Sequence, residues 1–94
     1  MPTARRTSAA VYRLAILEVM RDLGGRGEAE AILAEVERRL APRMLEGDYD
    51  VVQGEARWHR AARFERKELV DAGLLEPVFE PGVWQLTAAG LTEA

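Results

Sequence analysis

The chain has 94 residues, enough for one domain with a modest core, and its 48% hydrophobic and 31% charged composition excludes a disordered protein. It contains no cysteine, which excludes disulfides, thiolate zinc sites and cysteine nucleophiles. No apolar run approaches the roughly 20 residues of a membrane helix and no secretory signal pattern is present, so we expect a cytoplasmic protein without a membrane partner.

The N-terminal half of the sequence predicts an arm, two helices and a loop. Residues 1–7 are expected to form a flexible arm. Apolar residues recur at helical spacing from Ser8 to Leu23, and Ser8 offers an oxygen for the N-cap. The glycine-rich segment 24–27 ends this helix and connects it to a second helix from Glu28 to Leu40. The polar stretch from Ala41 to Gly54 is predicted to be a loop.

A third helix is predicted from Glu55 to Ala72, with Gly73 ending it. Glu65 falls on the same side of this helix as its apolar residues, so the buried face is not wholly apolar. The apolar residues of that face are Trp58, Ala62 and Leu69.

The pattern then changes to short β-prone runs at residues 74–79 and 83–86. Glu80-Pro81-Gly82 joins them and suits a type II turn, which predicts a hairpin, and Thr87 is a candidate cap for a last short turn. We therefore expect an α+β, mostly α fold over residues 8–94, namely a winged helix-turn-helix of three helices followed by a two-stranded hairpin wing. Its core should contain Trp58, Leu69, Trp84 and Leu86.

Three segments resemble the N-terminal domain of Mrr-type restriction proteins: Arg57-Trp58, the run ELVDAGLL at 68–75 and the run GVWQLTAAG at 82–90. In that family a tryptophan opens the recognition helix, L-x-x-A-G-L-L closes it, and G-x-W-x-L-T-x-x-G forms the second wing strand. The match is close from Trp58 to Gly90 and looser over residues 10–40.

The resemblance implies a winged helix that contacts DNA within a restriction, defence or transcription-related assembly. In the restriction proteins a nuclease domain follows this domain, whereas this chain stops at Ala94. We therefore expect a free-standing relative of the binding half, without cleavage activity.

Four cations on the third helix are the candidate DNA-binding residues. Arg60, Arg63 and Lys67 cluster opposite the tryptophan face, and Arg57 lies toward one flank. Cations in this position can meet phosphates or guanine edges of double-stranded DNA. They are equally compatible with a solvated face, in which Lys67 could pair with Asp71 and Glu68 lies near Arg57 on the helical wheel.

Two features favour the second interpretation. The net charge is −3, whereas many nucleic-acid-binding domains are basic. The wing tip Glu80-Pro81-Gly82 carries no lysine or arginine for a minor groove. The alternative to DNA binding is therefore a protein-protein interaction module that uses the same fold.

The sequence does not predict an enzyme, a cofactor or a metal site. His59 is the only histidine and the carboxylates are scattered, so neither a metal site nor a catalytic dyad is formed by spacing. Glu65-Arg66-Lys67 matches the short E-x-K element that Mrr-type nucleases use, but it lies within a predicted helix and not on a strand. We expect no catalytic role for it.

The first predicted helix has a second apolar stripe formed by Ala10, Leu14 and Leu17. Either this helix is buried on two sides within one monomer, or the stripe pairs with another chain. The second possibility predicts a homodimer through these three residues, or binding to a larger protein partner.

Overall fold

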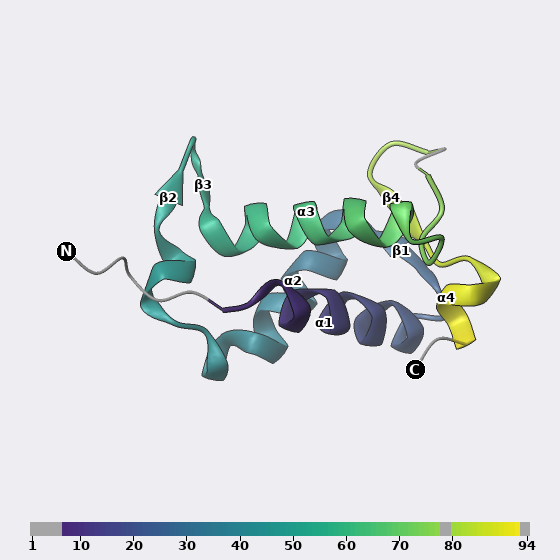
Figure 1. The fold of residues 1–94 in the computed structure, drawn as a ribbon, viewed down its shortest axis with the longest axis horizontal. Coiled ribbons are helices and arrows are strands. Elements are labelled where there is room, and N and C mark those ends of the chain that lie inside the picture. Colours follow the sequence, from purple (N-terminus) through teal and green to yellow (C-terminus); the bar gives the residue numbers. More distant parts are fainter. Residues whose placement is uncertain (1–6, 78–79, 93–94) are drawn as a thin grey trace.

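The computed structural model describes residues 7–77 and 80–92, and the fold is mixed, mostly helical, with two small two-stranded sheets (Figure 1). The helices are α1 (Ala9–Asp22), α2 (Ala29–Leu40), α3 (Arg57–Asp71) and α4 (Ala88–Thr92). The strands are β1 (Arg26–Glu28), β2 (Val51–Val52), β3 (Glu55–Ala56) and β4 (Val83–Gln85), and the 3-10 turns are η1 (Ala41–Arg43) and η2 (Glu46–Tyr49). Within the described ranges no helix is both long and apolar enough to cross a membrane.

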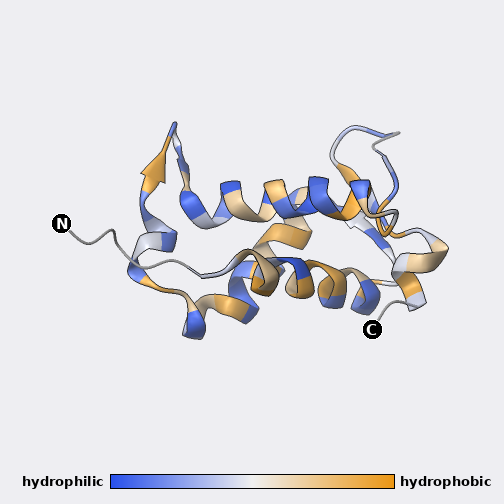
Figure 2. Cartoon of the chain, in the orientation of Figure 1, coloured by the Kyte–Doolittle hydropathy of each residue, from blue (hydrophilic) through white to orange (hydrophobic). Residues whose placement is uncertain are grey.

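Helix α1 is the centre of the helical packing, because α2 and α3 both pack against it (Figure 1). Figure 2 shows apolar residues over most of α1 and alternating polar and apolar residues along α3. The four residues predicted for one core are all buried and belong to a single cluster, which confirms that prediction: Trp58, Leu69, Trp84 and Leu86.

The second apolar stripe of α1 divides between core and surface. Leu17 is only 3% exposed, whereas Leu14 is 52% exposed and Ala10 is also exposed. Burial on two sides follows from the packing of α2 and α3 against the same helix. The prediction of a dimer interface that includes Leu17 is therefore wrong for that residue, because the monomer already buries it.

The start of α1 also differs from the prediction. Ser8 is the N-cap residue, but its hydroxyl makes no capping hydrogen bond. Instead, the main-chain oxygen of Ser8 accepts a hydrogen bond of 3.1 Å from the main-chain nitrogen of Val11. Of the predicted arm, residues 1–6 lie outside the described residues. Thr7 belongs to the folded domain, since its nitrogen and hydroxyl both bond to Asp48.

A strand that the sequence did not predict lies in the glycine-rich connection. Strand β1 pairs antiparallel with β4, with Arg26 opposite Gln85 and Glu28 opposite Val83. The predicted hairpin is present only in part. Leu75 forms a single antiparallel bridge with Leu86, and residues 78–79 of the predicted first strand lie outside the described residues. Strand β4 thus has β1 on one side and the segment after α3 on the other.

Two predicted glycine turns are confirmed. The main-chain nitrogen of Val83 donates to the oxygen of Glu80 at 3.1 Å, and Gly82 has φ +78°, as the third position of a type II turn requires. Gly73, also at φ +78°, follows the last turn of α3, where the nitrogen of Leu74 donates to the oxygen of Leu69.

The stretch predicted as a loop, residues 41–54, contains η1, η2 and strand β2, which pairs with β3. The pair forms a hairpin at the start of α3 (Figure 1). The hairpin turn is Gln53-Gly54, and both residues have positive φ, at +52° and +87°. A two-residue turn with positive φ at both positions matches the right-handed twist of the strands.

Candidate nucleic-acid interface

Helix α3 has one buried face and one charged face. Trp58, Ala62, Glu65 and Leu69 are buried. On the opposite side Arg60, Arg63 and Lys67 are exposed, as the helical wheel predicted, while Arg57 in the first turn is half-buried. Because the buried face is packed in the core, the helix cannot rotate, and the cations keep this outward direction.

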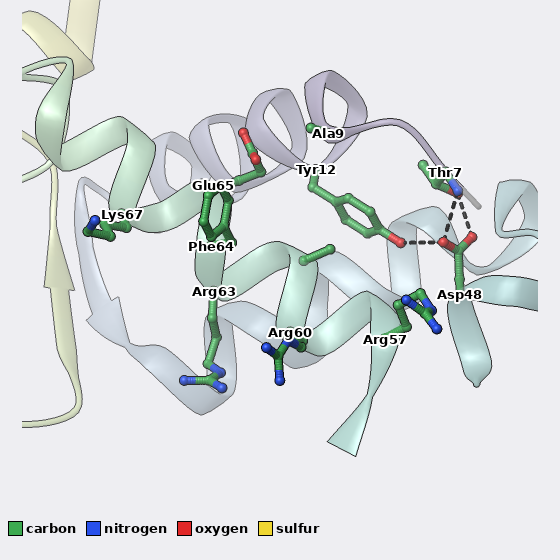
Figure 3. Close-up of a pocket in the computed structure, with 11 residues that line it drawn as sticks. Thr7, Ala9, Tyr12, Asp48, Arg57, Arg60, Arg63, Phe64, Glu65 and Lys67 are labelled. Atoms are coloured by element: carbon green, nitrogen blue, oxygen red, sulfur yellow. Dashed lines mark hydrogen bonds between the residues drawn. The ribbon is translucent and has the colours of Figure 1, made fainter. Parts of the chain in front are cut away.

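A surface groove of about 790 Å³ lies beside this charged face (Figure 3). All four predicted cations line it, together with Ala61 and Phe64 of the same helix. Thr7, together with Ala9 and Tyr12 of α1, forms the opposite wall of the groove. The predicted set, all from α3, therefore lines one wall of the groove, and the tertiary structure supplies the opposite wall.

Asp48 holds that second wall in place, although it is a buried carboxylate. It accepts hydrogen bonds from the nitrogen and hydroxyl of Thr7 at 2.9 and 2.6 Å and from the Tyr12 hydroxyl at 2.8 Å (Figure 3). The main-chain nitrogen of Leu45 donates a further hydrogen bond of 2.8 Å. Burial alone would raise the pKa of Asp48, but these hydrogen bonds outweigh it and leave the pKa below its usual value. Burial and the bond to Asp48 together raise the pKa of Tyr12.

The β2–β3 hairpin supplies polar partners for two of the four cations. Arg63 pairs with the Glu55 carboxylate at 2.5 Å, and Arg60 donates to the side-chain oxygen of Gln53. Glu55 also lies 2.6 Å from Nδ1 of His59. The hydrogen bond from Arg63, and to a smaller extent the one with His59, lowers the pKa of Glu55.

Lys67 does not form the pair that a purely solvated face would use. In the part of the chain that the structure describes, no ion pair joins Lys67 to Asp71. Arg57 and Glu68 share a direction on the wheel but lie about 16 Å apart along α3, too far to pair. Among the described residues, Arg63 is thus the one predicted cation that forms an ion pair with a carboxylate.

Two residues at this surface and one cation elsewhere were not predicted from the sequence. Phe64 is 59% exposed beside the cations, and its helical spacing from Arg60 was the signal for it. Gln53 belongs to a segment predicted as loop. Away from this surface, Arg26 of β1 lies 2.9 Å from Glu80 and so places a cation beside the turn at residues 80–82, which only the β1–β4 pairing brings about.

Glu65 and Lys67 of the E-x-K match lie on opposite sides of α3, and Glu65 has a structural role. Glu65 is 4% exposed and accepts hydrogen bonds from Nε and Nη2 of Arg13 at 3.1 and 2.9 Å, so it joins α3 to α1. Lys67 lies on the exposed side of the same helix. Among the residues that the structure describes, no three histidine, aspartate or glutamate side chains gather as a metal site.

Comparisons of the chain with known protein families, with curated proteins and with solved structures found no match in any of the three. The function of the site has to be inferred from its own geometry and chemistry.

Proposed function

We propose that this protein is a winged helix-turn-helix that binds double-stranded DNA through α3. The order α1, β1, α2, α3, bridge and β4 supports this assignment, as does the pairing of β4 with both β1 and the segment after α3. In this layout α3 is the recognition helix, and the segment between Leu75 and Leu86 is the wing. The resemblance of residues 58–90 to the Mrr-type domain supports the same assignment and suggests a restriction, defence or regulatory assembly.

The observation that carries the proposal is the row of outward cations on a helix whose opposite face is buried. Arg60, Arg63 and Lys67 point outward, half-buried Arg57 lies at their flank, and all four lie within the first three turns of α3 and line one groove. The acidic residues Glu68 and Asp71 follow in the last turn. This asymmetry favours entry of the N-terminal part of α3 into a major groove, which is about 12 Å wide and admits a helix.

The net charge of −3 does not conflict with this proposal, because the local distribution of charge governs phosphate binding. Arg60 and Lys67 are not neutralised by a carboxylate in the described ranges. Arg60 is the candidate for a bidentate contact to guanine. Arg63 can reach a phosphate only by exchanging its bond to Glu55.

The experiment is a titration of labelled duplex DNA at several salt concentrations. Each phosphate contact should contribute about −0.9 to the slope of log affinity against log salt. Changing Arg60, Arg63 and Lys67 to alanine should flatten that slope by up to about 2.7 if all three meet phosphates, and by about 0.9 if Arg60 contacts guanine and Arg63 stays paired with Glu55. Alanine keeps helix propensity high, and circular dichroism checks that the variant is folded.

The matched control is Arg38→Ala with Arg43→Ala, which removes exposed cations from α2 and η1 and should leave the slope unchanged. Absence of binding by the parent at low salt, or an unchanged slope in the triple variant, contradicts DNA binding. A protein-interaction module is then the function that remains. The exposed side chains of Leu14 and Phe64 favour that second candidate.

A further inference from the structure

Phe64 is a large apolar side chain that the fold leaves in water. It is 59% exposed on α3, although the same helix buries Trp58 and Leu69 almost completely. Helix rotation cannot hide the ring, because that rotation would expose the buried face and bring the cations into the core. An exposed ring of this size forgoes the stabilisation that burial gives to phenylalanine.

The neighbours of Phe64 are cations on the proposed DNA-contacting surface. Arg60 precedes it by four residues and Lys67 follows it by three, so the three side chains lie along one side of α3. All three line the same groove (Figure 3). If α3 enters a major groove, the ring enters with Arg60 and Lys67.

The chemistry of the major groove offers this ring one apolar partner. Base edges there present hydrogen-bond donors and acceptors, except for the C5 methyl group of thymine, and the sugar-phosphate backbone is charged. Helical rise places Arg60 and Phe64 about 6 Å apart along the axis, which corresponds to about two base steps of 3.4 Å.

We propose that Phe64 is a specificity-determining residue that packs on the methyl group of a thymine, one or two base steps from a guanine contacted by Arg60. This inference rests on the proposed function, because it requires α3 to enter the major groove. It adds a sequence preference to a surface whose phosphate contacts by themselves confer affinity without base discrimination.

The first stage of the test is selection of bound duplexes from a randomised library by the parent protein, at a salt concentration that suppresses phosphate-only binding. We expect the enriched sites to share a guanine with a thymine one or two steps away. Selection with Phe64→Ala should lose the thymine and keep the guanine. The control Leu14→Ala removes a similarly exposed apolar side chain from α1 and should select the same sites as the parent.

The second stage removes the methyl group alone, by replacing each thymine of an enriched duplex with deoxyuridine. At the contacted position the parent should bind about fourfold more weakly, as expected for one buried methyl-sized group. Phe64→Ala should bind the two duplexes equally. Circular dichroism confirms that this surface variant is folded.

The outcomes separate this inference from the proposed function. If the parent binds DNA with a salt-dependent affinity but enriches no thymine, or binds the deoxyuridine duplex equally well, the role of Phe64 is overturned and DNA binding stands. If the parent binds no duplex at low salt, both fail, and Phe64 belongs to a protein-contacting surface.

Discussion

The guanidinium of Arg63 lies 2.5 Å from the carboxylate of Glu55, so the β2–β3 hairpin occupies one cation of the surface proposed to meet DNA. The Arg63 side chain is 54% exposed and that of Glu55 is 23% exposed. Glu55 also contacts His59. In the proposed complex with DNA, the hairpin would therefore compete with phosphate for Arg63 through the carboxylate of Glu55.

Replacing Glu55 by glutamine should strengthen DNA binding. The change frees Arg63 and removes a negative charge beside the phosphates, so the slope of log affinity against log salt should steepen by about 0.9. Glu35→Gln is the matched control, since Glu35 has a similar 25% exposure and pairs with arginines of α2. Equal effects of the two substitutions in a salt titration would argue against a specific role for Glu55.

Replacing Arg13 by alanine should destabilise the fold by about 1–3 kcal/mol, because it leaves the Glu65 carboxylate buried without its charged partner. Arg38→Ala breaks a pair with Glu35 in which the arginine is 72% exposed, and should cost much less because solvent screens that pair. Urea denaturation measures both values. If Arg13→Ala lowers the free energy of unfolding no more than Arg38→Ala does, the buried Glu65 carboxylate does not need its arginine partner.

Asp48→Asn should reduce stability at neutral pH by about 1–3 kcal/mol, because an amide cannot accept all the hydrogen bonds that the carboxylate receives from Thr7, Leu45 and Tyr12. The folded pKa of Asp48 is lowered. Its stabilisation is therefore complete above the unfolded pKa, near 3.9, and is lost as the pH falls through the folded value.

The difference in unfolding free energy between parent and Asp48→Asn should accordingly shrink as the pH falls below about 4. Denaturation at a series of pH values measures it. The exposed Asp50 is the control position, and Asp50→Asn should follow the parent throughout. A gap between parent and Asp48→Asn that stays constant down to about pH 2 would contradict this account.

Leu14→Glu and Leu17→Glu should have opposite consequences for the fold. Leu14 is 52% exposed, so a glutamate there should leave the domain folded, whereas Leu17 is 3% exposed and a glutamate there would bury a charge without a partner. Thermal unfolding distinguishes the two variants. Sedimentation adds the oligomeric state, and a parent dimer that Leu14→Glu converts to monomer would assign the exposed part of the stripe to a homodimer.

Sequence patterns alone were sufficient for those features whose causes lie within a few residues of one another. Helical periodicity predicted α1, α2 and α3 to within two residues at each end, and it placed Trp58 inward and Arg60 outward. Pro81-Gly82 and Gly73 marked turns through backbone conformations that glycine favours. These signals depend on neighbouring residues along the chain, so they can be identified without knowledge of the tertiary structure.

The tertiary structure alone decided the features that require distant segments to meet. Strand β1 is three residues with no alternating apolar pattern, and it becomes a strand because β4, far along the chain, offers it hydrogen bonds. The burial of Leu17, the pairing of Glu65 with Arg13 and the closure of Thr7 on Asp48 likewise depend on which faces pack together. Each of these contacts joins segments that are distant in the sequence. Packing of the whole chain brings them together, and the spacing of residues within one segment does not predict it.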